Sequence, residues 1–146
     1  MPDEQFVHRW VMAALTCDGF SSERDCEIGV RLVDAEESQN LNRQYRHRDY
    51  PTNVLSFAGS ANDLLPDDEP LELGDLVLCV PKVEREASDQ RKKAADHWAH
   101  LLVHGTLHLL GHDHEHEGDA AAMESIEIAV LAAAGLPDPY RDQVGS

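Results

Sequence analysis

Three histidines near residue 110 have the spacing of a metal site. His104 and His108 are four residues apart, so on a helix their imidazoles lie on the same side, one turn apart. Gly111 can then turn the backbone, because glycine adopts a positive φ without steric cost, and His114 follows three residues later. Three imidazoles leave the fourth tetrahedral position of zinc for water, as in catalytic rather than structural sites. The sequence therefore predicts one catalytic Zn²⁺ per chain on His104, His108 and His114.

The same spacing, including the glycine turn, occurs in the zinc motif of metzincin proteases, but one residue differs. The protease motif has a glutamate directly after the first histidine, where it acts as the general base. This chain has Gly105 at that position, so the usual proton shuttle of peptide hydrolysis is missing. A minimal zinc metallopeptidase therefore remains a second hypothesis.

The residues around His114 leave further interpretations open. His112, Asp113 or His116 could complete the coordination shell and make the metal structural. The acidic, histidine-rich run 112–119 could also be a simple cation-binding segment. We interpret Asp113 as a carboxylate that orients a ligand imidazole, because zinc-bound histidines usually donate their other N–H to an oxygen.

A buried helix is expected to position the histidines. On a helix over residues 97–110, four histidines fall in a stripe roughly 80° wide, and the other faces are apolar. They are His97, His100, His104 and His108. A helix that is apolar almost all round is buried, so the histidines point into the protein or a cleft. The whole stretch 90–110 is predicted to be helical and to end at Gly111.

The remaining pattern predicts a mixture of strands and helices. Helices are expected at about 5–17, from the cap Asp34 to about 48–51, and at about 119–134. Glu37 would complete a capping-box-like pair with Asp34, and Pro81 would open another helix. Strands are expected at 27–33, 54–57 and 74–80, and an exposed loop at 58–73. The predicted fold class is α+β, a small mixed β-sheet backed by helices with a central buried histidine-bearing helix, in a single domain over residues 1–146.

Composition limits the location and the partners of the chain. No run approaches the roughly 18 apolar residues of a membrane span, and the start lacks the features of a secretion signal. The three cysteines form no Cys-x-x-Cys pair, which favours reduced thiols. These features predict a cytoplasmic protein without membrane association. With 28 acidic and 12 basic residues, the net charge of −16 repels a polyanion at long range, so any binding of nucleic acid depends on a local site.

Four sequence blocks resemble the YbeY family of bacterial endoribonucleases, which mature rRNA. The blocks are HGTLHLLGHDH at 104–114, LNRQYR at 41–46 followed by PTNVLSF at 51–57, LGDLV at 73–77, and a tail with ME at 123–124 and PY at 139–140. The family motif usually has tyrosine where this chain has His112. The resemblance implies an α+β fold with one zinc ion on the three histidines. It also implies a single-strand-specific endoribonuclease acting in 16S rRNA 3′-end maturation and ribosome quality control.

The resemblance further implies a catalytic role for Arg46. This arginine lies in the most basic stretch of the first half of the chain, residues 43–48. An arginine there can bind a phosphate bidentately and stabilise the charge that develops as a phosphodiester is attacked. From the residues alone, a solvated basic helix end that complements the helix dipole is an equally good interpretation. The resemblance favours the catalytic one.

The expected partner is RNA, namely small-subunit rRNA. A basic ribosomal protein or ribosome-assembly factor could deliver this acidic chain to its substrate, because complementary charge speeds association. A third hypothesis is a non-catalytic ribosome-assembly factor whose zinc mainly holds the fold. The residues identify no general base, and they leave open whether zinc-bound hydroxide or the 2′-OH of the RNA attacks.

Overall fold

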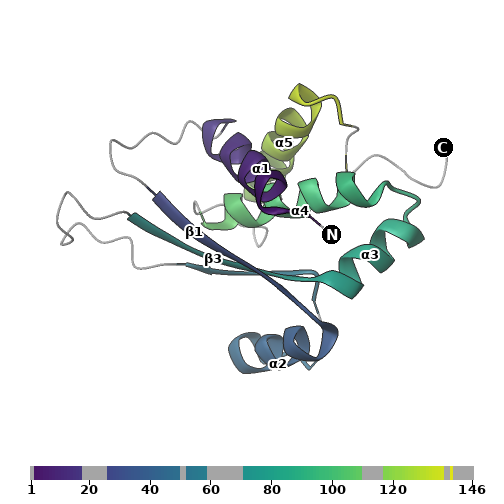
Figure 1. Ribbon diagram of the computed structural model, residues 1–146. Helices are drawn as coiled ribbons and strands as arrows, with labels where there is room; N and C mark the ends of the chain where they lie inside the picture. Colours follow the sequence, from purple (N-terminus) through teal and green to yellow (C-terminus); the bar gives the residue numbers. More distant parts are fainter. Residues whose placement is uncertain are drawn as a thin grey trace.

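The computed structural model describes residues 2–17, 26–49, 52–58, 71–109, 117–136 and 139. Along these residues the chain forms five helices and three strands (Figure 1). In chain order they are α1 (Glu4–Cys17), β1 (Cys26–Val33), α2 (Ala35–Arg46), β2 (Val54–Ala58), β3 (Leu71–Cys79), α3 (Val80–Asp89), α4 (Ala94–Leu109) and α5 (Glu117–Ala133). Within this part of the chain, no helix combines the length and the apolar character needed to cross a membrane.

The three strands form one mixed sheet in the order β1-β3-β2. β1 is parallel to β3, and β2 is antiparallel to it. Successive side chains of a strand point to opposite faces. Leu76 and Leu78 therefore face one side of the sheet and belong to its main core, while Val77 faces the other and packs with Val33 and Leu55.

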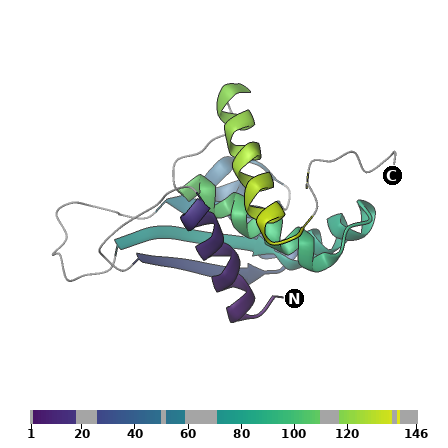
Figure 2. The same ribbon diagram turned by 90° about the horizontal axis from the view of Figure 1, so that it is seen from above.

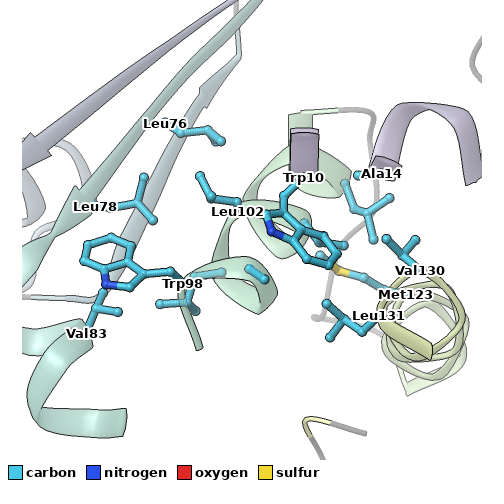
Figure 3. Packing of buried hydrophobic residues seen from close by; sticks show 14 residues of the cluster. Trp10, Ala14, Leu76, Leu78, Val83, Trp98, Leu102, Met123, Val130 and Leu131 are labelled. Atoms are coloured by element: carbon cyan, nitrogen blue, oxygen red, sulfur yellow. The ribbon is translucent and has the colours of Figure 1, made fainter. Parts of the chain in front are cut away.

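Helices cover both faces of the sheet. α1, α4 and α5 lie over the face of Leu76 and Leu78, and α2 lies over the opposite face (Figures 1 and 2). In the main core, Trp98 of α4 packs near Leu78 and Val83, and Trp10 of α1 lies near Leu102 (Figure 3). α4 is thus enclosed between the sheet and two helices. The predicted α+β class, with a mixed sheet and a central buried histidine-bearing helix, is confirmed.

α4 begins later than the sequence pattern predicts. The pattern predicts a helix from residue 90, but the helix begins at Ala94. Arg91 adopts a left-handed conformation with φ of 56°, and the N–H of Lys92 donates to the carbonyl of Ala87 over 2.8 Å. This turn ends α3 and separates it from α4. No glycine marks it in the sequence, so the usual signal of a helix end was missing.

Other element ends agree with the prediction or differ slightly. Asp34 caps α2 by accepting a hydrogen bond from the N–H of Glu37 over 2.9 Å. The side chain of Glu37 instead accepts from Arg31, so only half of the predicted capping pair forms. β3 begins at Leu71 rather than at residue 74, and α5 begins at Glu117 rather than at residue 119. Most of the predicted loop, residues 59–70, lies outside the described residues.

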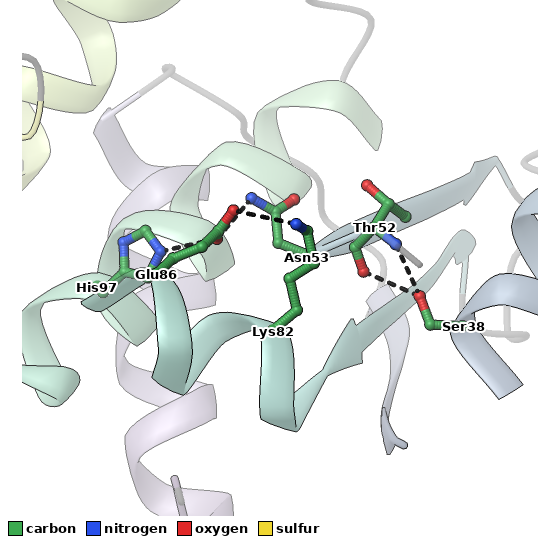
Figure 4. Close-up of polar contacts among 6 residues, drawn as sticks. All are labelled: Ser38, Thr52, Asn53, Lys82, Glu86 and His97. Carbon is green, nitrogen blue, oxygen red and sulfur yellow. Dashed lines mark hydrogen bonds and ion pairs between the residues drawn. The ribbon is translucent and has the colours of Figure 1, made fainter. Parts of the chain in front are cut away.

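A set of polar contacts fixes the start of β2 (Figure 4). The hydroxyl of Ser38 on α2 donates to the carbonyl of Thr52 over 2.9 Å and accepts from its N–H over 3.1 Å. Asn53 donates through Nδ2 to Glu86 Oε1 on α3 over 3.1 Å. The same carboxylate oxygen lies 3.1 Å from Nε2 of His97 on α4. β2 is therefore tied to both helical layers where it enters the sheet.

Candidate metal centre

α4 carries the candidate ligands and is held close to the sheet. A Cβ atom at Gly105 would lie 2.9 Å from Cδ2 of Leu76 and 3.4 Å from Cγ2 of Val54, so only glycine allows this approach without a shift of its neighbours. The hydroxyl of Ser56 on β2 donates to the carbonyl of Gly105 over 3.3 Å. The buried hydroxyl of Thr106 donates to the carbonyl of Leu102 over 2.7 Å. The backbone between the two histidines is thus fixed against the sheet.

His104 and His108 lie beside each other on α4. Their ring centroids are 4.7 Å apart and the rings are nearly perpendicular, at 73°. Two nitrogens bound to one tetrahedral zinc ion lie roughly 3.3 Å apart, since each Zn–N bond is about 2.05 Å. Imidazoles at the observed separation can present nitrogens at that distance. The third predicted ligand, His114, lies outside the described residues, as do His112 and His116, so the ligand trio stays a prediction.

A buried carboxylate joins two histidines of the stripe. Glu127 of α5 is 0% exposed, and its Oε1 is hydrogen-bonded to Nδ1 of His104. Its other oxygen, Oε2, lies 3.3 Å from Nε2 of His100. One ligand atom from each of the three side chains can be chosen so that all lie within 4.8 Å of one another. The group His100, His104 and Glu127 could therefore hold a metal ion, and it shares His104 with the predicted trio.

Sequence reasoning missed Glu127, although a signal was present. The glutamate occupies the same helical face as Met123, Val130 and Leu131, all of which are buried in the main core. A carboxylate in an apolar stripe is unusual, because a buried charge is costly unless it is paired. The histidines that pair with Glu127 lie on α4, so the sequence pattern of α5 alone does not identify them.

Burial also affects the protonation of His100. It lowers the pKa of this imidazole below its ordinary value, although the hydrogen bond and the charge of Glu127 act in the opposite direction. His100 is therefore neutral at neutral pH and carries one ring N–H. Since a carboxylate only accepts hydrogen bonds, that hydrogen lies on Nε2, which faces Glu127.

The four histidines at positions 97, 100, 104 and 108 of α4 thus have two different roles. His97, at the start of α4, is buried against Glu86 of α3 and belongs to the contacts that fix β2. His100 and His104 share Glu127, and His104 lies beside His108 toward the end of the helix. Among the described residues, the metal-binding candidates of α4 therefore lie between His100 and His108, with Glu127 beside them.

Arg46 lies apart from the histidines. It is the last residue of α2 and is exposed, on the face of the sheet opposite to α4. The neighbouring Tyr45 packs edge-on against Phe57 of β2, with ring centroids 5.1 Å apart. β2 therefore contacts the end of α2 on one face and the backbone of α4 on the other, and it lies at the edge of the sheet.

Comparison with known proteins places the chain in a family. It is 56% identical over 142 residues to the endoribonuclease YbeY of Alkalilimnicola ehrlichii, which covers 97% of this chain and 83% of that protein. It is 50% identical over 142 residues to the endoribonuclease YbeY of Halorhodospira halophila, covering 97% and 90%. The solution structure of TM1509 from Thermotoga maritima shares the fold, with a TM-score of 0.55 at 22% identity over 97% of this chain and 95% of that one. The family profile described as endoribonuclease YbeY matches residues 2–135, and the chain therefore belongs to the endoribonuclease YbeY family.

Proposed function

We propose that this chain is a metal-dependent endoribonuclease that hydrolyses phosphodiester bonds in single-stranded RNA. The observation that carries this proposal is the family match over residues 2–135, which includes the adjacent histidines His104 and His108. The relatives described above bear the name of an endoribonuclease. The proposed substrate is small-subunit rRNA, with a role in 16S rRNA 3′-end maturation and ribosome quality control in the cytoplasm.

The proposed metal is one zinc ion on His104, His108 and His114. The donor chemistry fits, because imidazole nitrogens suit zinc and the two described rings lie close enough to share one ion. When bound there, zinc supplies Lewis-acid chemistry toward a phosphodiester. The protein holds the two described imidazoles on a helix that is buried on nearly all sides and anchored to β2 through Ser56.

Arg46 is proposed to bind a phosphate of the RNA and to stabilise charge in the transition state. Its exposed position leaves its guanidinium accessible to an RNA strand. One face of β2 contacts α2 and the other contacts α4. An RNA molecule that crosses the edge of the sheet at β2 could therefore reach both Arg46 and the histidines. Position 105 supplies no general base, since Gly105 faces Leu76 and has no side chain.

The charge of the chain bears on its delivery to RNA. A net charge of −16 opposes long-range attraction to a polyanion. We propose that a basic ribosomal protein or ribosome-assembly factor brings the enzyme to its substrate, since complementary charges raise association rates. Salt-sensitive association with a purified small-subunit protein would support this, and salt-independent or absent association would contradict it.

The decisive experiment is RNA cleavage by the purified chain. A single-stranded fragment from the 3′ region of small-subunit rRNA should be cut, and DNA of the same sequence should remain intact. A chelator should abolish cleavage and added zinc should restore it. His108→Ala should lose activity, while His8→Ala, which changes an exposed histidine of α1, should keep it. Cleavage that persists at full rate after metal removal would overturn the proposal.

The same preparation separates the alternatives. A minimal metallopeptidase would cleave casein in a zinc-dependent way and leave RNA intact. An assembly factor with structural zinc would bind the fragment without cutting it, and chelation would unfold the domain, which circular dichroism would detect.

A further inference from the structure

Glu127 has an environment that its helix alone does not explain. Among the described residues it is the only buried carboxylate, and its side chain is 0% exposed. Burying a carboxylate is costly unless its oxygens are hydrogen-bonded. Both oxygens of Glu127 meet ring nitrogens, one from His100 and one from His104. The hydrogen-bond partners of this carboxylate are therefore two histidines of the candidate metal centre.

The contact with His104 selects one form of that imidazole. A carboxylate accepts hydrogen bonds, so Nδ1 of His104 carries the hydrogen that it donates to Oε1. A neutral imidazole has one N–H, and its lone pair is then on Nε2. This nitrogen points away from Glu127, because the two ring nitrogens lie on different sides of the ring. Metal-bound histidines typically donate their other N–H to a carboxylate in this way, which fixes the ring and raises its basicity.

We propose that Glu127 is a positioning residue of the metal centre. Its carboxylate holds Nδ1–H of His104, so that Nε2 is the metal donor, and Nε2–H of His100 holds the second carboxylate oxygen in place. This inference rests on the metal site of the proposed function and is independent of the substrate. It assigns a role to His100, which is not part of the predicted ligand trio.

Direct ligation by Glu127 is the competing arrangement, since His100, His104 and Glu127 could themselves surround an ion. That arrangement would require His104 to bind through Nδ1 and would break both hydrogen bonds of a carboxylate with no exposed surface. It would also turn Nε2 of His104 away from the ion. The positioning role keeps both hydrogen bonds and leaves His104 and His108 as neighbouring donors.

The test is Glu127→Gln, which keeps the shape of the side chain and removes its charge. Zinc affinity is measured by competition with a chromophoric chelator, and the absorption of the Co²⁺-loaded protein reports the number and geometry of the ligands. We expect zinc affinity to fall by about 10- to 100-fold, as for other carboxylates behind a zinc ligand, with the tetrahedral Co²⁺ bands retained. Glu124→Gln, three residues earlier on α5 and partly exposed, is the matched control and should match the wild type.

Two outcomes would overturn the inference. Zinc affinity in Glu127→Gln equal to that of the wild type would show that the carboxylate does not support the site. Loss of metal in both Glu127→Gln and His100→Gln, with metal retained in His108→Ala, would make Glu127 a ligand instead. Thermal melting of the metal-free variants checks that each one folds.

If Glu127→Gln does not fold, His100→Phe provides the second variant. It leaves the carboxylate in place but removes the group that holds Oε2, so zinc affinity should fall several-fold, and an unchanged affinity would contradict the proposal. All these measurements are made without RNA. Failure to cleave RNA with normal zinc binding would therefore count only against the proposed function, while a wild-type chain that binds neither Zn²⁺ nor Co²⁺ would overturn both.

Discussion

Gly105 and Leu76 are in such close contact that a Cβ atom on the glycine would lie 2.9 Å from Cδ2 of the leucine. Leu76 is fully buried in the middle of β3, so it has little room to move away. The missing side chain at position 105 therefore lets α4 lie this close to the sheet without a shift of Leu76. It also means that a glutamate at the position used by zinc peptidases would point into the sheet, which gives a structural reason for the absence of that base.

The first prediction concerns this contact. Gly105→Ala should lower the free energy of unfolding by about 1 kcal/mol, since overpacking costs ~1–3 kcal/mol and the better helix propensity of alanine offsets part of it. Gly105→Glu should cost several kcal/mol more, because it buries a charge without a partner. Urea denaturation measures both. In a Leu76→Val background the cost of Gly105→Ala should shrink, and a Gly105→Glu variant as stable as the wild type would refute the packing explanation.

The second prediction concerns acid stability. Burial raises the pKa of Glu86, but hydrogen bonds from His97 and Asn53 and the nearby charges of His97 and Lys82 lower it by more, so the net pKa lies below the ordinary value of 4.5. A carboxyl pKa lowered by folding contributes stability that is present above about pH 4.5 and is lost as the pH falls through the folded-state value.

Glu86→Gln should therefore reduce the free energy of unfolding at neutral pH, by about 1–3 kcal/mol for a charged hydrogen bond. The difference from the wild type should shrink as the pH falls below about 4.5. Denaturation curves across this range provide the measurement. Glu84→Gln, which changes an exposed residue of the same helix, is the control. A Glu86→Gln deficit that stays constant from neutral to acid pH would rule out this linkage.

The third prediction concerns Arg46 and depends on the proposed endoribonuclease activity. Arg46→Ala should lower kcat/KM on single-stranded RNA by roughly 10²- to 10³-fold, the usual cost of losing one transition-state donor. Arg46→Lys should restore only part of the activity, because an ammonium cannot bind a phosphate bidentately. Unfolding free energies should stay the same, since Arg46 is exposed. The control is Arg85→Ala, which removes another exposed arginine, on α3, and should leave the cleavage rate unchanged. Equal cleavage rates for Arg46→Ala and Arg85→Ala would show that Arg46 has no role in the mechanism.

The fourth prediction concerns the core that supports α4. Leu102 is fully buried between the sheet and α1, so Leu102→Ala should lower the free energy of unfolding by about 2–5 kcal/mol through lost burial and a cavity. Met12→Ala on α1 shortens an exposed apolar side chain and should change the free energy of unfolding by less than about 0.5 kcal/mol. Thermal and urea denaturation should agree, and similar losses for the two variants would contradict this placement of the core.

Features that depend on neighbours along the chain follow from the amino-acid sequence alone. Helical and strand periodicity predicted the elements, and Asp34 was correctly identified as a helix cap. The four-residue spacing placed His104 and His108 side by side, because both lie on one continuous helix. It could not predict the turn at Arg91, where the backbone leaves the helix without a glycine.

Contacts between groups far apart in the chain depend instead on how the elements pack together. Glu127 is 23 residues from His104, on a helix whose orientation is set by packing rather than by local pattern. Gly105 suggested an altered chemistry in the sequence, and the contact with Leu76 shows a steric reason as well. Arg46 lies on the opposite face of the sheet from the histidines, which no spacing along the chain indicates. Local periodicity determines which face of an element is buried, but the contacts between elements depend on how those faces pack in three dimensions.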